Sequence, residues 1–244
     1  MDQTGPWPEG ELLGFDLETT GVDRFSDVPV SFALVRMEAG VVIGCDASLV
    51  DPGREIPTGA VEVHGISTER ARAEGIPLAD AFGRVSDALL DASNRGVPVV
   101  GMNLSYDLTI LDVQCRGRTG LGLGERGWGG PALDALTLDR QVDKYRKGKR
   151  RLENLCLQYE VELAEAHEAS ADAEAAVRVV VAMATRYLAL RDTPLADLHA
   201  AQILWHREWA LSLDDYRAKN GQTPLDPSDY IWPIAWPIAR SAVA

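Results

Sequence analysis

Residues 15–21 read Phe15-Asp16-Leu17-Glu18-Thr19-Thr20-Gly21, which places two carboxylates two positions apart at the end of a predicted strand. Side chains alternate along a strand, so Asp16 and Glu18 share one face while Phe15 and Leu17 point into the core. Neighbouring carboxylates repel unless cations lie between them, and oxygen-rich sites suit Mg²⁺ or Mn²⁺. The stretch therefore predicts half of a metal site. The alternative for an isolated motif of this kind is a solvated edge strand that enters a turn.

Composition indicates a soluble globular protein. The chain has 244 residues, enough for one domain with or without an appendage, and 46% of them are hydrophobic and 25% charged. A net charge of −13 argues against a protein that holds nucleic acid by bulk electrostatic attraction. It does not exclude a nuclease, because bound divalent cations and a local basic strip can reverse the field where the substrate lies.

The cysteines and the N-terminus bear on location. Cys45, Cys115 and Cys156 have no Cys-x-x-Cys spacing, so they predict neither a disulfide framework nor a zinc ribbon. The first residues lack the basic and apolar regions of a signal peptide, and no apolar run approaches the ~18 residues that a membrane span requires. We therefore expect a cytoplasmic protein that has no membrane partner.

The pattern along the chain predicts an α/β fold with a mixed central sheet. Strands are expected over residues 11–18, 29–37 and 41–50, the last two forming an antiparallel hairpin beside the first. Later segments give helices from Pro77, over 105–116 with Ser105 as N-cap, and over 170–191, and short strands over 97–101 and 132–138. Residues 117–131 hold seven glycines and are expected to be loop. This order of elements is typical of a mixed sheet with the hairpin at one side.

The C-terminal region differs in character. Residues 192–244 contain four of the six tryptophans, a helical stretch near 195–219 and two copies of Trp-Pro-Ile-Ala, whose prolines preclude a regular helix there. We read it as a helical, Trp-rich appendage to a main domain of residues 8–191. It is expected to pack on that domain or on a second subunit.

Two further acidic positions each begin a predicted helix. Asp107 lies four residues after Asn103, in the first turn of a helix that follows a strand, and Asp172 lies five residues after His167 at the start of the last long helix. An acid at a helix N-terminus is stabilised by the helix dipole whether or not it has a function. A single loop histidine is likewise ordinary. The order of the three motifs is what distinguishes this chain.

That order resembles the DEDDh 3′–5′ exonuclease superfamily, which includes the proofreading subunit of bacterial replicative polymerases, ribonuclease T and oligoribonuclease. The resemblance covers about residues 10–190. It implies a ribonuclease H-like three-layer fold, with the mixed central sheet flanked by helices.

The resemblance also implies roles for individual residues. The four catalytic, metal-binding acids would be Asp16, Glu18, Asp107 and Asp172, and His167 would take the proton from the attacking water. Two Mg²⁺ ions are expected, with Mn²⁺ as a substitute; Asp16 would bridge both, and Asp107 would act mainly through metal-bound water. The terminal nucleotide would be contacted by Thr19, Thr20, Gly21, His64 and Asn103. Met102 departs from the pattern, since many relatives carry His before this Asn.

A run of basic residues is a candidate for substrate binding. Residues 144–151 hold six basic residues in eight positions, within an acidic protein. A solvated loop is the alternative, but the isolation of this run favours phosphate contacts through Lys147 and Arg150.

We therefore expect a metal-dependent 3′–5′ exonuclease that releases nucleoside monophosphates from a free 3′ end of DNA or RNA. An exoribonuclease acting on short RNA or RNA tails is the first alternative. The second is a polymerase-accessory or binding protein whose tail recruits a polymerase or a second copy, because tryptophan-rich surfaces often mark interfaces. The intact set of four acids and a histidine argues against a catalytically inactive relative.

Overall fold

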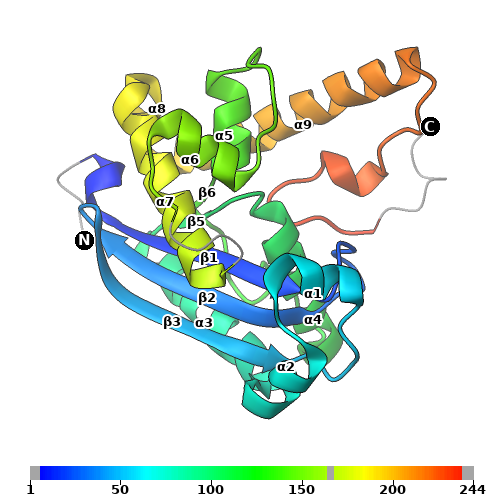
Figure 1. Cartoon of the computed structure of the whole chain (residues 1–244). Coiled ribbons are helices and arrows are strands. Elements are labelled where there is room, and N and C mark those ends of the chain that lie inside the picture. Colours follow the sequence, from blue (N-terminus) through cyan, green and yellow to red (C-terminus); the bar gives the residue numbers. More distant parts are fainter. Residues whose placement is uncertain (1–5, 164–167, 238–244) are drawn as a thin grey trace.

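A six-stranded mixed sheet forms the centre of the computed structural model, which describes residues 6–163 and 168–237 (Figure 1). The strand order is β4-β3-β2-β1-β5-β6, with β2 antiparallel to both β1 and β3, and the pairs β1–β5, β5–β6 and β3–β4 parallel. The strands are β1 Glu11–Thr19, β2 Pro29–Glu38, β3 Val41–Asp51, β4 Ile76–Pro77, β5 Val99–Gly101 and β6 Ala132–Asp134. The predicted mixed-sheet α/β fold and its hairpin are confirmed.

Helices cover both faces of this sheet. They are α1 Thr58–His64, α2 Thr68–Glu74, α3 Leu78–Arg95, α4 Ser105–Thr119, α5 Ala135–Val142, α6 Leu152–Tyr159, α7 Ala169–Arg186, α8 Leu188–Asp192 and α9 Leu195–Lys219, with 3₁₀ turns η1 Trp7–Glu9 and η2 Pro227–Tyr230. None of the described helices is both long and apolar enough to cross a membrane.

The alternation of β1 decides which layer each of its side chains enters. Leu13, Phe15 and Leu17 are buried in a cluster with residues of α3 and α4. Leu12 points to the other face, where it joins a cluster built from α5, α6 and α7. Asp16 and Glu18 have the same parity as Leu12, so the strand directs both carboxylates toward the α7 side of the sheet.

Four predicted element boundaries differ from the structure. The strand expected over 132–138 ends at Asp134, because the Asp134 carboxylate accepts the Leu136 N–H at 2.9 Å and caps α5, which begins at Ala135. Ser105 is the first helical residue of α4, not its N-cap, and the loop after α4 begins at Gly120. The helix expected over 170–191 is divided at Tyr187, whose extended backbone (φ −120°, ψ 90°) separates α7 from α8.

The C-terminal region covers the outer edge of β6. The buried Gln202 side chain accepts the Asp134 N–H at 2.8 Å and donates to the Ala132 carbonyl at 2.9 Å, so its amide satisfies edge groups that a further strand would otherwise bond. His199 Nδ1 accepts the Ala132 N–H at 3.1 Å. Leu198 and Trp232 join the cores on opposite faces of the sheet. The division of the chain near residue 191 remains a prediction.

Gly14 lets α7 approach β1 closely. A Cβ atom on Gly14 would lie 2.7 Å from the Ala173 carbonyl oxygen and 3.0 Å from Val177 Cγ2. The first distance is shorter than any ordinary carbon contact, and it involves backbone, so α7 would have to move. Ala173 directly follows Asp172, so this contact also sets where Asp172 meets the strand.

We expect Gly14→Ala to destabilise the protein by about 1–3 kcal/mol, the usual cost of overpacking a core. Gly44→Ala on β3 is the matched control, because its Cβ would approach no atom closer than 3.8 Å and the substitution removes the same backbone freedom from the unfolded chain. The measurement is urea unfolding of both variants. Equal midpoints for the two variants would contradict the close approach.

Candidate functional site

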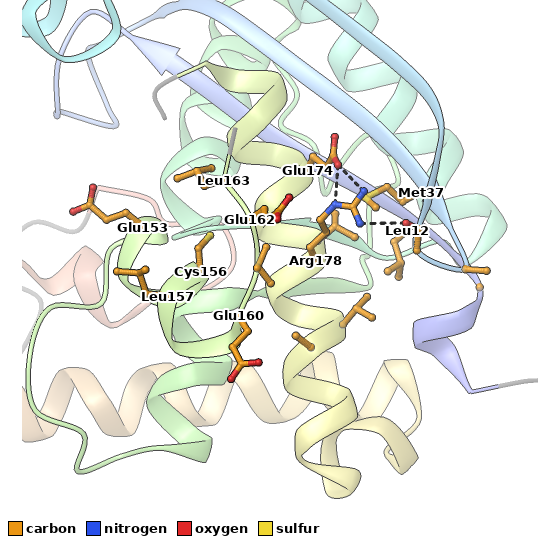
Figure 2. A pocket seen from close by; sticks show the side chains of 17 residues that line it. Leu12, Met37, Glu153, Cys156, Leu157, Glu160, Glu162, Leu163, Glu174 and Arg178 are labelled. Atoms are coloured by element: carbon orange, nitrogen blue, oxygen red, sulfur yellow. Dashed lines mark hydrogen bonds and ion pairs between the residues drawn. The ribbon is translucent and has the colours of Figure 1, made fainter. Parts of the chain in front are cut away.

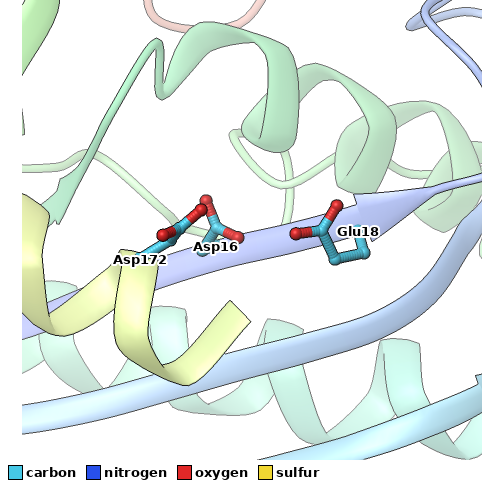
Figure 3. A group of neighbouring side chains, drawn as sticks. All are labelled: Asp16, Glu18 and Asp172. Atoms are coloured by element: carbon cyan, nitrogen blue, oxygen red, sulfur yellow. The ribbon is translucent and has the colours of Figure 1, made fainter. Parts of the chain in front are cut away.

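Three carboxylates from two elements meet beside the end of β1. One oxygen from each of Asp16, Glu18 and Asp172 lies within 4.8 Å of the others (Figure 3). Asp16 and Glu18 come from the α7-facing side of β1, and Asp172 comes from the first turn of α7. The structure thus brings together acids that are more than 150 positions apart in the sequence.

Asp107 adjoins this group from α4. It lies in the first turn of that helix, is 4% exposed, and its Oδ1 accepts the Leu17 N–H at 3.2 Å. Leu17 separates Asp16 from Glu18 on β1, so the bond fixes Asp107 against the strand between the two acids. The charge of Asp107 raises the pKa of Asp16, which shows that the two carboxyl groups are close in electrostatic terms.

Burial and mutual repulsion disfavour negative charge in this cluster. The pKa of Asp16 is well above its usual range, first because of burial and then because of Asp107, Glu18 and Asp172. Burial, followed by the charge of Asp172, raises the pKa of Glu18 to about 7. Burial also raises the pKa of Asp107 well above its usual range, against the effect of backbone hydrogen bonds from Asp107 and Leu17.

This cluster fits a divalent cation. Among the described residues, no Lys, Arg or His forms an ion pair with Asp16, Glu18 or Asp107. Buried carboxylates without such a partner are costly unless they are protonated or coordinate metal. The oxygen-only donor set is the one that hard divalent cations prefer.

The loop after β1 is held by its own hydrogen bonds. The hydroxyls of Thr19 and Tyr106 both donate to the Gly21 carbonyl, and they lie 3.0 Å from one another. Thr20 donates to Asp27 Oδ1 at 2.7 Å, and its N–H bonds the Val28 carbonyl at 3.0 Å. The Thr19, Thr20 and Tyr106 side chains therefore fix the shape of the loop at Gly21.

His64 and Asn103 come from separate segments, the end of α1 and the turn before α4. His64 ends α1, where its Nδ1 accepts the Ile66 N–H at 3.1 Å, and it lines a cavity of about 560 Å³ that also includes Ser31 and Ser170. Ser31 pairs with Glu18 across the sheet, so this cavity adjoins the acids. Asn103 is exposed with φ +59°, and its N–H donates to Asp134 Oδ1 at 2.9 Å. His167 lies outside the described residues.

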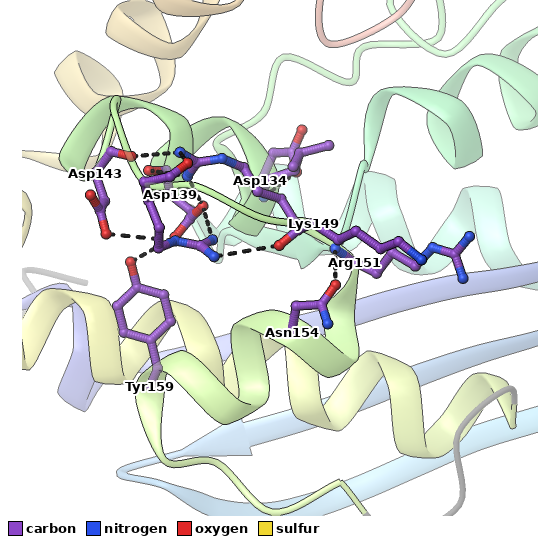
Figure 4. A network of polar contacts seen from close by, with 10 residues as sticks. Asp134, Asp139, Asp143, Lys149, Arg151, Asn154 and Tyr159 are labelled. Atoms are coloured by element: carbon purple, nitrogen blue, oxygen red, sulfur yellow. Dashed lines mark hydrogen bonds and ion pairs between the residues drawn. The ribbon is translucent and has the colours of Figure 1, made fainter.

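The basic run divides into inward-facing and outward-facing residues. Arg146 and Arg150 both form ion pairs with the fully buried carboxylate of Asp139, whose other oxygen accepts the Tyr159 hydroxyl at 2.8 Å (Figure 4). Arg150 also donates to the Asp143 carbonyl at 2.6 Å. Lys147, by contrast, is exposed. The structure therefore gives Arg150 a network inside the protein, and it leaves Lys147 accessible.

Two residues near the acids were not singled out from the sequence. Asp134 caps α5, accepts the Thr137 hydroxyl at 2.9 Å and the Trp232 Nε1–H at 3.3 Å, and contributes to the raised pKa of Asp107. Tyr106 immediately precedes Asp107 and supports the loop at Gly21. The place of Tyr106 next to Asp107 in the sequence could have indicated that Tyr106 lies near the acids. The role of Asp134 could not be recognised, because the sequence placed this residue inside a predicted strand.

A further cavity, of about 1110 Å³, lies between α6, α7 and the β2–β3 hairpin (Figure 2). Its floor is apolar, and its rim carries Glu153, Glu160, Glu162 and the Glu174–Arg178 ion pair. None of Asp16, Glu18, Asp107 and Asp172 lines it. A rim with four carboxylates does not suit a phosphate-bearing ligand.

Comparison with known proteins agrees with this geometry. The family model described as Exonuclease (RNase T) matches residues 13–180. PolC-type DNA polymerase III of Lacticaseibacillus paracasei is 30% identical over 174 residues, which cover 71% of this chain and 11% of that protein. The PolC-type polymerase of Halalkalibacterium halodurans is 29% identical over 175 residues, which cover 70% of this chain and 11% of that protein. The chain thus spans about a tenth of the length of these relatives.

A solved structure has a similar fold. E. coli Exonuclease I in complex with a dT13 oligonucleotide superposes with a TM-score of 0.62 and 25% identity, over 75% of this chain and 43% of that one. Its fold is ribonuclease H-like, as the resemblance implied for this chain. With the family model matching more than half of the sequence, the chain belongs to the RNase T exonuclease family, within the DEDD-type 3′–5′ exonuclease superfamily.

Proposed function

We propose that this protein is a metal-dependent 3′–5′ exonuclease that releases nucleoside monophosphates from single-stranded DNA, with RNA as the alternative substrate. The observation that carries the proposal is the meeting of Asp16, Glu18 and Asp172 within 4.8 Å, with Asp107 held beside them. The oligonucleotide in the Exonuclease I complex supports DNA as the substrate.

The four acids would hold two Mg²⁺ ions, with Mn²⁺ as a substitute. When bound, such a pair supplies stabilisation of the attacking and leaving oxygens in an in-line displacement. Asp16, the most central carboxylate, would serve both ions, and Asp107 would keep its orientation through the Leu17 N–H. His167 would take the proton from the attacking water, as a histidine with a pKa near neutrality can.

The chain also provides contacts for the terminal nucleotide. The loop at Gly21, held by Thr19 and Tyr106, would face the 3′-terminal sugar, and the cavity at His64 would receive the base. Asn103 would contact the same nucleotide from the side of α4. Of the basic run, Lys147 and not Arg150 would contact phosphates, because the Arg150 guanidinium already bonds Asp139 and Asp143.

The relatives bear on the cellular setting. PolC-type polymerases carry a segment similar to this chain, which supports a polymerase-associated role in the cytoplasm, with the C-terminal region as the contact surface for a polymerase or a second copy. Exposed side chains on that region, including Leu204, Leu211 and Trp236, are the ones available for such a contact.

The function is tested by digestion of matched 5′-labelled DNA and RNA oligonucleotides in Mg²⁺. We expect single-nucleotide shortening from the 3′ end, full block by a 3′-phosphate, and a rate below about a tenth of normal for Asp16→Ala, because that residue would hold both ions. Thermal melting of the same variant shows that it is folded. Cleavage of a circular strand, or a tenth of the normal rate in Asp16→Ala, would refute the proposal.

The raised carboxyl pKa values predict how stability depends on pH without metal. The pKa of Glu18 is about 7 in the folded protein against 4.5 ordinarily, so between these values the folded state holds a proton that the unfolded state has released. Stability should therefore fall as pH rises from about 4.5 to 7. Saturating Mg²⁺ should reverse the fall at pH 7 and above, because it binds the ionised folded state.

Glu18→Gln should reduce the loss of stability between pH 4.5 and 7, and it should raise Tm by a few degrees at pH 7.5 in EDTA. The matched control is Glu62→Gln, at an exposed position on α1, which should change neither the pH profile nor the response to Mg²⁺. Melting curves from pH 4 to 8, with and without Mg²⁺, make the comparison. A metal-free Tm that rises over this range in the wild type would contradict the charge repulsion described here.

The division of the basic run gives opposite outcomes for two substitutions. Arg150→Ala should cost about 1.5–3 kcal/mol in stability, because it removes a charge-assisted hydrogen bond from a buried carboxylate that keeps Arg146 and Tyr159 as partners. Lys147→Ala should leave stability unchanged and reduce the slope of log K against log salt by about 0.7 for a single strand. Unfolding and salt-dependent binding are measured for both. An unchanged slope in Lys147→Ala would exclude that residue from the phosphate contacts.

A further inference from the structure

A cleft rich in cations and aromatic rings lies between α5, the loop that follows it and α9. Its volume is about 500 Å³, within the range of about 300–1,000 Å³ typical of small-ligand sites. The lining side chains that bear on its chemistry are Arg140, Lys144, Tyr145, Arg150, Trp205 and Trp209. We call it the α5–α9 cleft.

The aromatic side chains of this cleft are placed for stacking. Tyr145 is 89% exposed, and Trp205 and Trp209 are half-buried on α9. The Arg140 guanidinium lies 3.5 Å from the centroid of the Trp209 ring, a cation–π contact that holds the indole in place. Burial lowers the pKa of Arg140 to about 10, so this side chain stays positively charged at neutral pH.

The charge of the cleft is opposite to that of the protein. Among the described residues, Glu208 is the one acidic residue that lines the cleft, against three Lys and Arg residues, while the whole chain carries a net charge of −13. Lys144 is exposed and forms no ion pair within the described part of the chain. Arg140 and Arg150 are held by protein partners, so Lys144 is the cation left to meet a ligand phosphate.

The cleft is connected to the acids through secondary structure. Thr137, Arg140, Gln141 and Lys144 line it with the spacing of one helical face along α5 and its end. α5 begins directly after Asp134, whose charge contributes to the raised pKa of Asp107. The eight residues of α5 span only about 12 Å along the helix axis. At the other end of the loop, Lys149 and Arg151 extend away from the Asp139 network (Figure 4), and α6, which follows, packs on α7.

We propose that the α5–α9 cleft binds an unpaired nucleotide of a single-stranded substrate, upstream of the 3′ end being cut. The base stacks on Tyr145 and the neighbouring indoles, and the phosphate contacts Lys144. Stacking of this kind needs a free base face, so the cleft selects single strands over duplexes. The inference rests on the proposed function, since the strand it holds is the exonuclease substrate.

The test measures binding of labelled dT3, dT20 and a 20-base-pair duplex in an Asp16→Ala background with Ca²⁺. We expect Tyr145→Ala to weaken dT20 binding about 5-fold or more, with little change for dT3, and Lys144→Ala to reduce the salt slope by about 0.7. The control is Tyr216→Ala with Lys219→Ala, the same substitutions at exposed positions on the far end of α9. Both test positions are exposed, and melting curves confirm folding.

Equal dT20 affinity in the control and in Tyr145→Ala would overturn the proposal, as would equal losses for dT20 and the duplex. Binding of dTMP is measured as well, because a free nucleotide offers the same base and phosphate as a strand. Tight dTMP binding that depends on Tyr145, together with dT20 affinity that does not, would show that the cleft binds a free nucleotide and would overturn the proposal. Binding is read without turnover. If the wild-type protein digests DNA but Tyr145→Ala binds dT20 normally, only the proposal for the cleft is refuted. If dT20 binding depends on Tyr145 but the wild-type protein does not digest DNA, the proposed exonuclease function is refuted.

Discussion

Mutual repulsion among buried and partly buried carboxylates is the constraint around which this fold is arranged. Asp16 and Glu18 on β1, Asp107 on α4 and Asp172 on α7 are held close enough that burial and neighbouring charge raise the pKa of each of the first three. Such a cluster costs stability in the absence of a cation, so it persists only because the surrounding structure fixes it. Apolar packing on both faces of the sheet provides that fixation.

Backbone geometry and not side-chain pairing brings the acids together. Gly14 allows α7 to lie against β1, and the Leu17 N–H anchors Asp107 between the two strand acids. Both contacts involve main-chain atoms, which move less readily than long side chains. The consequence is a site whose spacing is set before any cation binds, so that little of the binding energy is lost to rearrangement.

The sequence was informative where local rules and tertiary packing agree. β1, the hairpin and α9 follow from period-two and helical patterns that packing reinforces, and the order of the acidic motifs indicated the cluster. Local rules failed at Asp134, where a strand-like run turns into α5 because one carboxylate caps a helix and also meets Trp232 about 100 positions away. The inward turn of Arg150 was also hidden, because its partner Asp139 is buried only in the folded chain.

The C-terminal region is joined to the site by specific polar contacts as well as by apolar packing. Gln202 completes the edge of β6, Trp232 bonds Asp134, and Arg24 in the loop after β1 forms an ion pair with Asp229 of η2 at 2.6 Å. His206 of α9 also lies 2.9 Å from the Asp229 carbonyl, so the loop at Gly21 and α9 are both tied to η2. A nucleic-acid strand that contacted both the loop at Gly21 and the α5–α9 cleft would bind elements that already constrain one another. Ordering one of these contacts would therefore lower the entropic cost of forming the other.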